Sequence, residues 1–513
     1  MSSASPTPRR TGTIAAVAVV VLLAASAVLY WVLIGLQRGV FLNGVPAADP
    51  HVFPRPVTDV VALLSAQSQY LPLAAAVLLA YVVVLLLVRW TRGRAVGRIA
   101  VIAGVLGQLA LLPTSPTLSI DLYSYVAHGY LAATPGSNPY TMAAASVADS
   151  PLGPSLFAQG WTAVHPQTPY GPLWTHAERL LVAFAANDVP RAALLLKAVV
   201  VVATIGTGLL AWAIAARVRP GAGPLAASAW LLNPVVVIEF GAEGHNDAVA
   251  IFFVALALLA ALQGWALVAV LAIAGGTLVK WLPAAFAVPV LVWLFRQARS
   301  KRRVLVEVTV GVVAAVAGTW WLWAPWWAGL DTFDGLRASA TPNPSPSPAG
   351  WLAQVLFDPL ALEPSILPSL AMVGALLVVA VAASWGGRPS SWLAGCAVVA
   401  VAALAISPLY WPWYTALPIA VLAMRPTAVA LCQVVVLTAG SRFVALWGDL
   451  GALGQKSYEQ IFSESPLYGI TWPVAACVVL GLIGAAVHAV RRLIASRGGR
   501  TGEMRSPAAA PQA

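Results

Sequence analysis

Long and nearly uninterrupted apolar runs dominate this 513-residue sequence and restrict the folds that are open to it. With 60% hydrophobic and 9% charged residues, the chain carries too little polar surface for a soluble protein of this length. We therefore predict an all-α polytopic membrane protein with about 12 to 14 transmembrane helices. The runs that approach a full span lie at 13–36, 71–88, 99–118, 192–216, 224–241, 247–262, 264–279, 282–295, 304–323, 367–384, 391–406, 412–424, 427–441 and 469–490.

Cationic residues give these spans an orientation. If the N-terminus is cytoplasmic, 20 of the 29 Lys and Arg residues fall in alternate loops on that side, as the positive-inside bias expects. Both termini are then cytoplasmic, and the long loops lie on the external (periplasmic) face of a multi-pass plasma-membrane protein. The formal charge of +11 therefore reflects topology, and it gathers into no basic patch that would bind nucleic acid.

The chain divides into five parts by composition. Two polar tails rich in Pro, Ser, Gly and Arg are predicted to be disordered and cytoplasmic. The parts are the tail 1–12, the N-terminal helices 13–98, a central module 99–300 with the external loop 119–190, the C-terminal helices 301–495 with the external loops 324–366 and 442–468, and the tail 496–513. Because the long loops share one side, a site built from their unusual residues is expected on the external face.

Asp121 opens the longest external loop at the point where an apolar run ends. The apolar residues that follow it recur at a helical spacing, which predicts a short amphipathic helix lying along the membrane surface. Asp121, Ser124 and His128 occupy the opposite stripe of this helix and are expected to point together into a cleft. Capping of the helix by Asp121 is the simpler explanation, but it does not account for the alignment with His128.

Two stiff, aromatic segments follow in the same loop. Asn138 and Tyr140 lie in the first segment, and Tyr170 and Trp174 lie in the second. Proline and glycine at this density fix the backbone without regular structure. We interpret the segments as a preformed rim for a polar ligand. The alternative is that the proline and glycine residues only form ordinary turns in the loop.

A second polar cluster lies in the short external hairpin between two apolar runs. Its members are Glu239, Glu243, His245, Asn246 and Asp247. Two interpretations stay open: a solvated turn with Asn and Asp as helix caps, or a site in which His245 and Asp247 hold ligand hydroxyl groups. A divalent metal is the less favoured ligand because the sequence has no Asp-x-Asp pair, so we expect no metal and no cofactor.

Two cations at external helix ends are candidates for binding a phosphate. Lys280 would act as a point charge, although snorkelling to the interface is common for such a lysine. Arg442 would offer two parallel hydrogen bonds. Most of the 21 Trp residues are expected to form an interfacial belt. Stacking of a sugar ring on an indole is the alternative for the two clusters at 320–327 and 411–413.

Several of these segments together resemble a known family. The runs Asp121-Leu-Tyr-Ser-Tyr-Val-Ala-His-Gly-Tyr130, Gly136-Ser-Asn-Pro-Tyr140 and Tyr170-Gly-Pro-Leu-Trp174 resemble the actinobacterial polyprenyl-phosphomannose-dependent α-mannosyltransferases. These enzymes have the GT-C fold and extend lipomannan-type glycans. Similar to the same family are the segments Trp230–Pro234, Glu239–Asp247, Leu278–Lys280 and Ser407–Tyr414, so that the resemblance covers roughly residues 100–430.

The resemblance implies a GT-C-type glycosyltransferase on the external face of the membrane. It would move a mannosyl residue, with inversion, from polyprenyl-phosphate-mannose to a lipid-linked or cell-envelope glycan, with an α-1,6 linkage. Asp121 would be the catalytic base, and Lys280 and Arg442 would bind the donor phosphate. The substrate-binding residues would be Tyr123, Ser124, His128, Asn138, Tyr140, Tyr170, Trp174, Glu243, His245, Asn246, Asp247, Tyr410 and Trp413. The expected partners are the lipid donor, a glycan or glycolipid acceptor and membrane lipids, with the oligomeric state left open.

Two other functions stay open on sequence alone. An arabinosyltransferase that uses a polyprenyl-phosphate-arabinose donor needs the same base and the same phosphate site. A transporter or flippase for lipid-linked sugars is the second alternative. Transporters usually carry internal repeats and ionisable groups near the midplane. Here most charges lie at helix ends and no repeat is visible, while Gly275-Gly276 inside one span favours the transporter.

Overall fold

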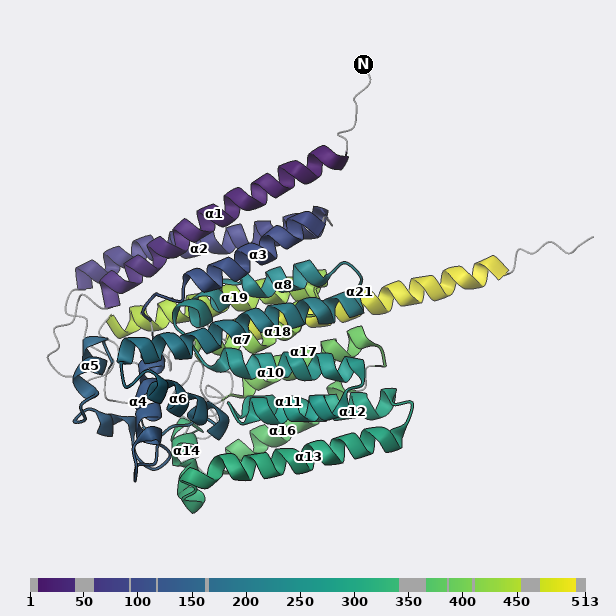
Figure 1. Ribbon diagram of the computed structural model, residues 1–513. Coiled ribbons are helices and arrows are strands. Elements are labelled where there is room, and N and C mark those ends of the chain that lie inside the picture. Colours follow the sequence, from purple (N-terminus) through teal and green to yellow (C-terminus); the bar gives the residue numbers. More distant parts are fainter. Residues whose placement is uncertain are drawn as a thin grey trace, which may run out of the picture.

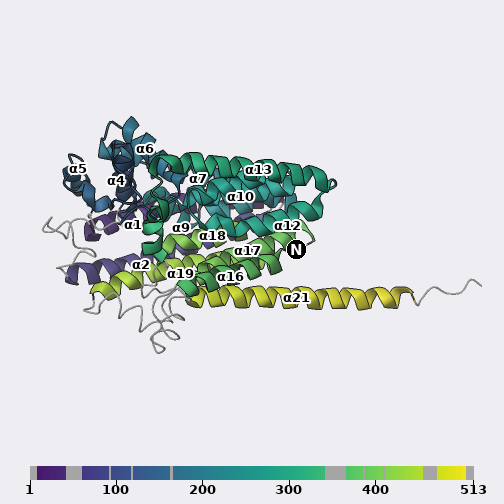
Figure 2. The same cartoon turned by 90° about the horizontal axis from the view of Figure 1, so that it is seen from below.

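The computed structural model describes residues 8–41, 60–91, 94–116, 119–161, 166–340, 366–384, 387–407, 411–453 and 471–503. Every regular element in these ranges is a helix, which confirms the all-α prediction. The longer helices run side by side as a bundle, and the last helix extends well beyond it (Figures 1 and 2).

The bundle combines long and short apolar helices. The long ones are α1 (Pro8–Phe41), α2 (Val60–Thr91), α7 (Val189–Val218), α13 (Lys301–Trp323), α16 (Ile366–Ala383), α17 (Pro389–Ile406), α19 (Ala428–Leu453) and α21 (Thr471–Glu503). The shorter ones are α3 (Arg94–Ala110), α8 (Gly223–Leu231), α10 (Asp247–Gln263), α11 (Ala266–Thr277), α12 (Ala287–Gln297) and α18 (Ala416–Ala423).

The described helices are apolar enough for a protein that crosses a membrane several times. Five of them can span by length and composition, or six if one bent pair counts as a single span, and seven shorter apolar helices of 10–17 residues accompany them. The polytopic prediction is therefore confirmed. Several of the predicted runs form helices that are shorter than a full span, because turns and 3-10 segments such as η3 (Leu282–Phe286) divide them.

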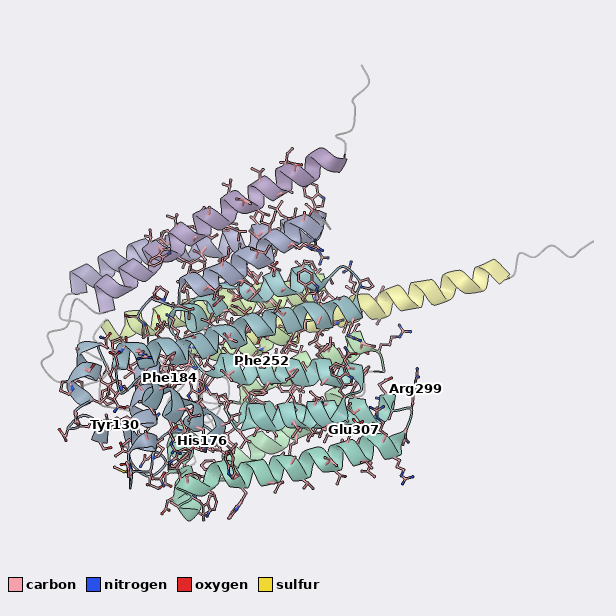
Figure 3. The ribbon with its side chains drawn as sticks, viewed as in Figure 1. Tyr130, His176, Phe184, Phe252, Arg299 and Glu307 are labelled. Atoms are coloured by element: carbon pink, nitrogen blue, oxygen red, sulfur yellow. The ribbon has the colours of Figure 1, made fainter. Side chains whose placement is uncertain are left out.

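One end of the bundle carries the non-spanning elements. Here lie α4 (Asp121–Ala133), η1 (Ala144–Val147), α5 (Gly153–Ala158), α6 (Pro172–Phe184), η4 (Ala324–Trp326), η5 (Gly329–Phe333) and α14 (Asp334–Ala340) (Figure 1). The turn between α12 and α13 lies at the other end, where Figure 3 labels Arg299, far from Tyr130 and His176. The two ends of the molecule therefore differ in chemistry as well as in architecture.

The predicted surface helix after Asp121 exists, but it is more buried than an amphipathic surface helix. Ten of the 13 residues of α4 are buried, because α6 and the neighbouring loop cover it. Gly129 permits the close approach of α6: a Cβ at this position would lie 2.7 Å from the backbone oxygen of Glu178. The two helices together form a packed cap on the end of the bundle.

The run 224–241, predicted as one span, is broken. Helix α8 ends before Asn233, and α9 (Pro234–Val236) and the π-helical turn η2 (Val237–Ala242) continue at an angle of 48°. Pro234 has no N–H to continue α8, and the Asn233 side chain accepts the N–H of Val235 as a cap. The same side chain donates to Tyr81 Oη (3.2 Å) and Thr438 Oγ1 (2.7 Å), which fixes the break against α2 and α19.

Two predicted external loops differ from the structure. Helix α19 continues to Leu453, past the predicted start of the loop 442–468, and its sequence there has no proline that would end the helix. The first part of the loop 324–366 forms η4, η5 and α14, and residues 341–365 lie outside the described part of the chain.

Candidate active site

The centre of the site is an imidazole between two carboxylates. His245 Nδ1 lies 3.4 Å from Asp121 Oδ2, and His245 Nε2 lies 3.3 Å from Glu239 Oε2. The His245 side chain is fully buried and that of Glu239 is 3% exposed, whereas 16% of the Asp121 side chain is accessible. The accessible acid thus lies beside a buried histidine, and a second, buried acid lies on the other side of that imidazole.

Three separate elements bring these side chains together. Asp121 is the first residue of α4, and Glu239 lies in the π-helical turn η2 of the broken helix. His245 lies in the loop between η2 and α10, where its backbone N–H donates to the backbone carbonyl of Glu239 (3.0 Å). A π-helical turn adds one residue to a helical turn and is frequent at functional sites. Here it turns the Glu239 carboxylate towards the imidazole.

The structure corrects the capping explanation for Asp121. The N-cap residue of α4 is Ile120, whose side chain makes no capping hydrogen bond. Asp121 already lies within the helix. Its backbone N–H donates to Ser119 Oγ (3.1 Å), so the side chain is not needed to satisfy the helix end. The interpretation of the second cluster as a solvated turn is also wrong, because all five of its members are buried by the surrounding helices.

An aromatic ring covers the imidazole. Trp413, in η6 (Pro412–Thr415), stacks on His245 with a centroid distance of 3.7 Å and an interplanar angle of 19°. Trp411 stacks on Trp413 in turn, at 5.2 Å and 3°. Trp413 was predicted to bind substrate directly. In the structure its ring stacks on both His245 and Trp411, and contact with substrate stays a prediction.

The second charged pair of the site lies beside this stack. Lys280 Nζ lies 2.9 Å and 2.8 Å from the two carboxylate oxygens of Asp247. The ammonium also lies 4.8 Å from the centroid of the Tyr414 ring and 5.9 Å from that of Tyr170. Burial disfavours the charge on Lys280, but the Asp247 carboxylate outweighs this and raises the pKa of Lys280 above its usual value. Lys280 is therefore a cation that is paired with Asp247 and lies near the rings of Tyr170 and Tyr414.

The rim segment predicted around Tyr170 fixes the position of Lys280. The N–H groups of Gly171 and Leu173 donate to the carbonyls of Val279 (3.0 Å) and Leu278 (2.9 Å). Only glycine fits at 171, since a Cβ would lie 2.2 Å from the oxygen of Leu278. The loop 166–172 is thereby joined to the end of α11, directly before Lys280.

Tyr125 links the rim to the second cluster. Its hydroxyl accepts the N–H of Asn246 (3.3 Å), and its ring makes edge contacts with Tyr170 and Trp174, each at 5.3 Å. Burial, with the nearby charges of Asp121 and Asp247, raises the pKa of Tyr125 well above its usual value. Tyr125 is a structural residue that the predicted site did not include, although its place on the helix after Asp121 was a signal for it.

Other predicted ligand residues lie in the cap and contact other parts of it. Ser124 Oγ accepts from Trp161 Nε1 (3.1 Å), and His128 Nε2 lies 3.4 Å from the carbonyl of Pro166. Tyr123 Oη donates to Gln159 Oε1 at 3.4 Å. Trp161 and Pro166 therefore lie against Ser124 and His128, and a role of these two side chains in ligand binding stays a prediction.

Asn138 and Tyr140 stiffen the base of the cap. Asn138 donates to the carbonyl of Trp326 (3.0 Å) and accepts the N–H of Tyr140 (3.0 Å). The Tyr140 hydroxyl lies 2.9 Å from Thr175 Oγ1 on α6, and its ring packs on Trp323. Both residues join the cap to the end of α13.

Glu243 and the buried Lys197 connect the site to α3. Glu243 Oε2 accepts the N–H of Ser119 (3.1 Å), two residues before Asp121. Lys197, on α7, donates to the carbonyls of Leu111 (2.8 Å) and Thr114 (2.6 Å) and to Thr114 Oγ1 (2.9 Å). These contacts fix the segment that leads from α3 to Asp121.

Two predicted site residues cannot be placed. Tyr410 lies outside the described residues, and Arg442 lies on α19 with its side chain outside them. Within the described part of the chain, no three His, Cys, Asp or Glu side chains converge as metal ligands would. What the described groups offer is a partly accessible carboxylate, a buried imidazole 3.4 Å from it, and a cation nearby.

Comparison with known proteins finds a matching family and two named relatives. A family described as α-(1→6)-mannopyranosyltransferase, N-terminal domain, matches residues 37–297. A protein named α-(1→6)-mannopyranosyltransferase A from Corynebacterium glutamicum is 25% identical over 273 residues, which is 51% of this chain and 51% of that protein. A protein of the same name from Mycobacterium tuberculosis is 28% identical over 201 residues, or 38% of this chain and 36% of that protein.

The chain thus spans about half the length, or less, of the curated relatives that it matches. The family match covers the broken helix, α4, α6, η2 and α10, and therefore all of Asp121, Glu239, His245, Asp247 and Lys280. Because the match extends over half of the sequence, this protein belongs to the α-(1→6)-mannopyranosyltransferase family.

Proposed function

We propose that this protein is an inverting mannosyltransferase. It transfers a mannosyl residue from polyprenyl-phosphate-mannose to a lipid-linked or cell-envelope glycan, and it forms an α-1,6 linkage. Family membership and the names of both relatives support the mannosyl group and the linkage. The donor, the acceptor and the inversion rest on the chemistry that the described side chains can perform.

The observation that carries the proposal is the arrangement of Asp121, His245 and Glu239. An acceptor hydroxyl must lose its proton as it attacks, and one carboxylate within hydrogen-bond reach is sufficient for this. Asp121 is the accessible member of the group. His245 fixes its orientation, and Glu239 lies on the other side of the ring, so that the base is oriented by further groups as in other acid–base sites.

The donor chemistry explains the second charged pair. The acceptor oxygen attacks C1 of the mannosyl group, the bond from C1 to the phosphate oxygen breaks, and polyprenyl phosphate leaves with the electron pair. The acceptor proton passes to Asp121. Direct displacement inverts C1, so a β-linked donor yields an α-linked product. The leaving phosphate needs charge stabilisation, which the Lys280 ammonium supplies. Asp247 holds this ammonium in place before the donor arrives.

The external face is the side on which we propose that the reaction occurs. Cationic turns of the kind that stay in the cytoplasm, such as that around Arg299, lie at the opposite end of the bundle from the cap (Figure 3). Sugar nucleotides are cytoplasmic, so an external site needs a sugar carried across the membrane by a lipid. A polyprenyl phosphate meets that requirement, and the apolar bundle next to the site suits its chain.

The decisive experiment replaces Asp121 by Asn in the full-length protein. The purified variant, in detergent, is given radiolabelled polyprenyl-phosphate-mannose and an α-mannoside acceptor. We expect transfer to fall about 100- to 10,000-fold, the range that a general base contributes. A sealed compartment is not needed, so turnover by the wild type in detergent also argues against a transporter.

Glu307→Gln serves as a matched control, because Glu307 pairs with Arg303 on α13, towards the other end of the bundle. This variant should transfer mannose at the wild-type rate. An Asp121→Asn protein that elutes as the wild type does from a sizing column and still turns over normally refutes the role of Asp121.

A further inference from the structure

Three aromatic rings form a continuous stack that starts at His245, the imidazole beside Asp121. His245 stacks on Trp413 at 3.7 Å, and Trp413 stacks on Trp411 at 5.2 Å with the two indole planes only 3° apart. Accessibility rises along the stack: His245 is fully buried, Trp413 is half-buried, and Trp411 is 36% exposed. Trp411 is therefore the outermost ring, and one of its faces is taken by Trp413.

The stack belongs to the wall of the site. Trp413 also makes an edge contact with Tyr414 (6.2 Å), whose ring lies 4.8 Å from Lys280 Nζ. The Pro412 carbonyl, between the two tryptophans, accepts hydrogen bonds from Thr415 Oγ1 (2.8 Å) and Ser441 Oγ (2.9 Å). These contacts tie the short segment to α19, so the indole of Trp411 is a rigid surface rather than a free side chain.

An interfacial anchor would look different. Trp320 and Trp321 on α13 are 68% and 71% exposed, as expected of indoles that face the surroundings of a bundle. Trp411 is about half as exposed and is aligned with the ring that covers His245. Trp411 is a flat, rigid and partly accessible indole at the outer end of the stack that starts at His245. Such a surface suits a neutral sugar ring, which packs its C–H face on an aromatic face.

We propose that Trp411 forms an acceptor subsite for a hexose that precedes the reacting sugar in the acceptor glycan. The inference rests on the proposed function. The reacting hydroxyl must lie at Asp121, next to His245. Because Trp413 separates Trp411 from His245, a ring stacked on the outer side of Trp411 lies at least one sugar unit back along the acceptor. Trp411 therefore contributes to the binding of longer acceptors and makes no contact with the donor.

The test compares acceptors of different length. The full-length Trp411→Ala variant is assayed with a synthetic α-1,6-mannoside that has one sugar and with an α-1,6-mannotetraose, both with the same lipid donor. We expect the KM for the tetrasaccharide to rise about 5- to 10-fold, the range that corresponds to one aromatic contact. The KM for the monosaccharide, the donor KM and kcat should stay at wild-type values.

Two further variants separate stacking from anchoring and from folding. Trp411→Leu keeps the apolar bulk without a flat ring and should behave like the alanine variant, whereas Trp411→Phe should keep most of the preference for the longer acceptor. Trp321→Ala is the matched control, and it should leave the ratio of the two acceptor KM values unchanged.

Several outcomes overturn the proposal. It fails if Trp411→Ala changes both acceptor KM values by the same factor, if it changes the donor KM, or if Trp321→Ala gives the same result. It also fails if the Leu variant keeps the wild-type preference. Failure of the proposed function is seen separately, in the Asp121→Asn variant. The acceptor-length comparison is made only after mannosyl transfer by the wild-type enzyme has been measured.

Discussion

Both carboxylate oxygens of Asp247 lie within 2.9 Å of the Lys280 ammonium. The lysine lies in the turn between α11 and η3, and the acid is the first residue of α10. The side chains of Lys280 and Asp247 are only 21% and 11% exposed. A largely buried pair is costly to break, because the remaining charge is left uncompensated. The pair therefore keeps a cation ready for an anionic ligand without leaving it unpaired in an apolar surrounding.

A prediction about the donor follows from this pair. Lys280→Gln should raise the donor KM about 10- to 100-fold, since a hydrogen bond between a charged group and phosphate is worth about 1.5–3 kcal/mol. It should also destabilise the protein by about 3 kcal/mol, because Asp247 is left without its cation. Donor KM and the thermal unfolding temperature in detergent measure the two effects.

The double variant Lys280→Gln/Asp247→Asn separates them. It carries no unpaired charge, so the unfolding temperature should return towards the wild-type value while the donor KM stays high. Recovery of donor binding together with stability would contradict a direct role for Lys280 at the phosphate.

Glu239 gives a second prediction. Glu239→Gln should lower kcat about 10- to 100-fold with little change in KM, because His245 loses one of the two charged groups between which its ring lies. Steady-state kinetics with saturating donor measures this. Glu307→Gln is again the matched control. A change confined to KM would mean that Glu239 contacts the acceptor and does not act through His245.

Lys197 is predicted to stabilise the segment before Asp121. Its side chain is 1% exposed and donates three hydrogen bonds at the end of α3. Lys197→Met leaves the Thr114 carbonyl without its lysine donor, at a cost of about 1–3 kcal/mol. The Leu111 carbonyl still accepts hydrogen bonds from the N–H and Oγ1 of Thr114. The unfolding temperature in detergent should fall by several degrees. The exposed Lys301→Met provides the control, and equal unfolding temperatures for the two variants would rule out this role.

The fourth prediction concerns the stability of the cap as a function of pH. Glu178, on α6, is fully buried, and burial raises the pKa of its carboxyl well above the usual value. The folded state then holds the proton more tightly than the unfolded state. Its contribution to stability is complete below the unfolded pKa and is lost as the pH rises towards the folded pKa, by about 1.4 kcal/mol for each pH unit.

Glu178→Gln should remove this dependence. The wild type should unfold at a lower temperature at pH 8 than at pH 5, and the variant should show a smaller difference between the two. Unfolding scans of both proteins in one detergent test it. A pH dependence that is identical in the two proteins would show that Glu178 does not carry this effect.

Part of the fold and of the site could be predicted from local pattern. Apolar runs specify helices in a membrane without reference to the rest of the chain. The spacing after Asp121 predicted α4 at its observed start. The cluster Glu239–Asp247 was recognised because so many polar residues are unusual between two apolar runs. Its solvated interpretation was wrong, since burial depends on helices elsewhere in the sequence.

Tertiary packing decided which polar groups meet. Ser124 and His128 share a helical stripe with Asp121. Ser124 nevertheless accepts a hydrogen bond from Trp161, and His128 lies beside the carbonyl of Pro166. These partners lie more than 35 residues further along the chain, so the local spacing could not predict them. His245 and Asp121 are 124 residues apart, and no periodicity relates them. The pairing of Lys280 with Asp247 likewise depends on how α10 and α11 pack.

The sequence by itself determined that this chain is a helical membrane protein with an acid at the lip of one span, because hydropathy and helical spacing act over short distances. Only the tertiary structure decided that His245 and Glu239 stand behind that acid and that a line of indoles leads away from it. These contacts arise from a broken helix, a π-helical turn and a short 3-10 segment, whose positions are set by long-range packing and by hydrogen bonds such as those of Asn233.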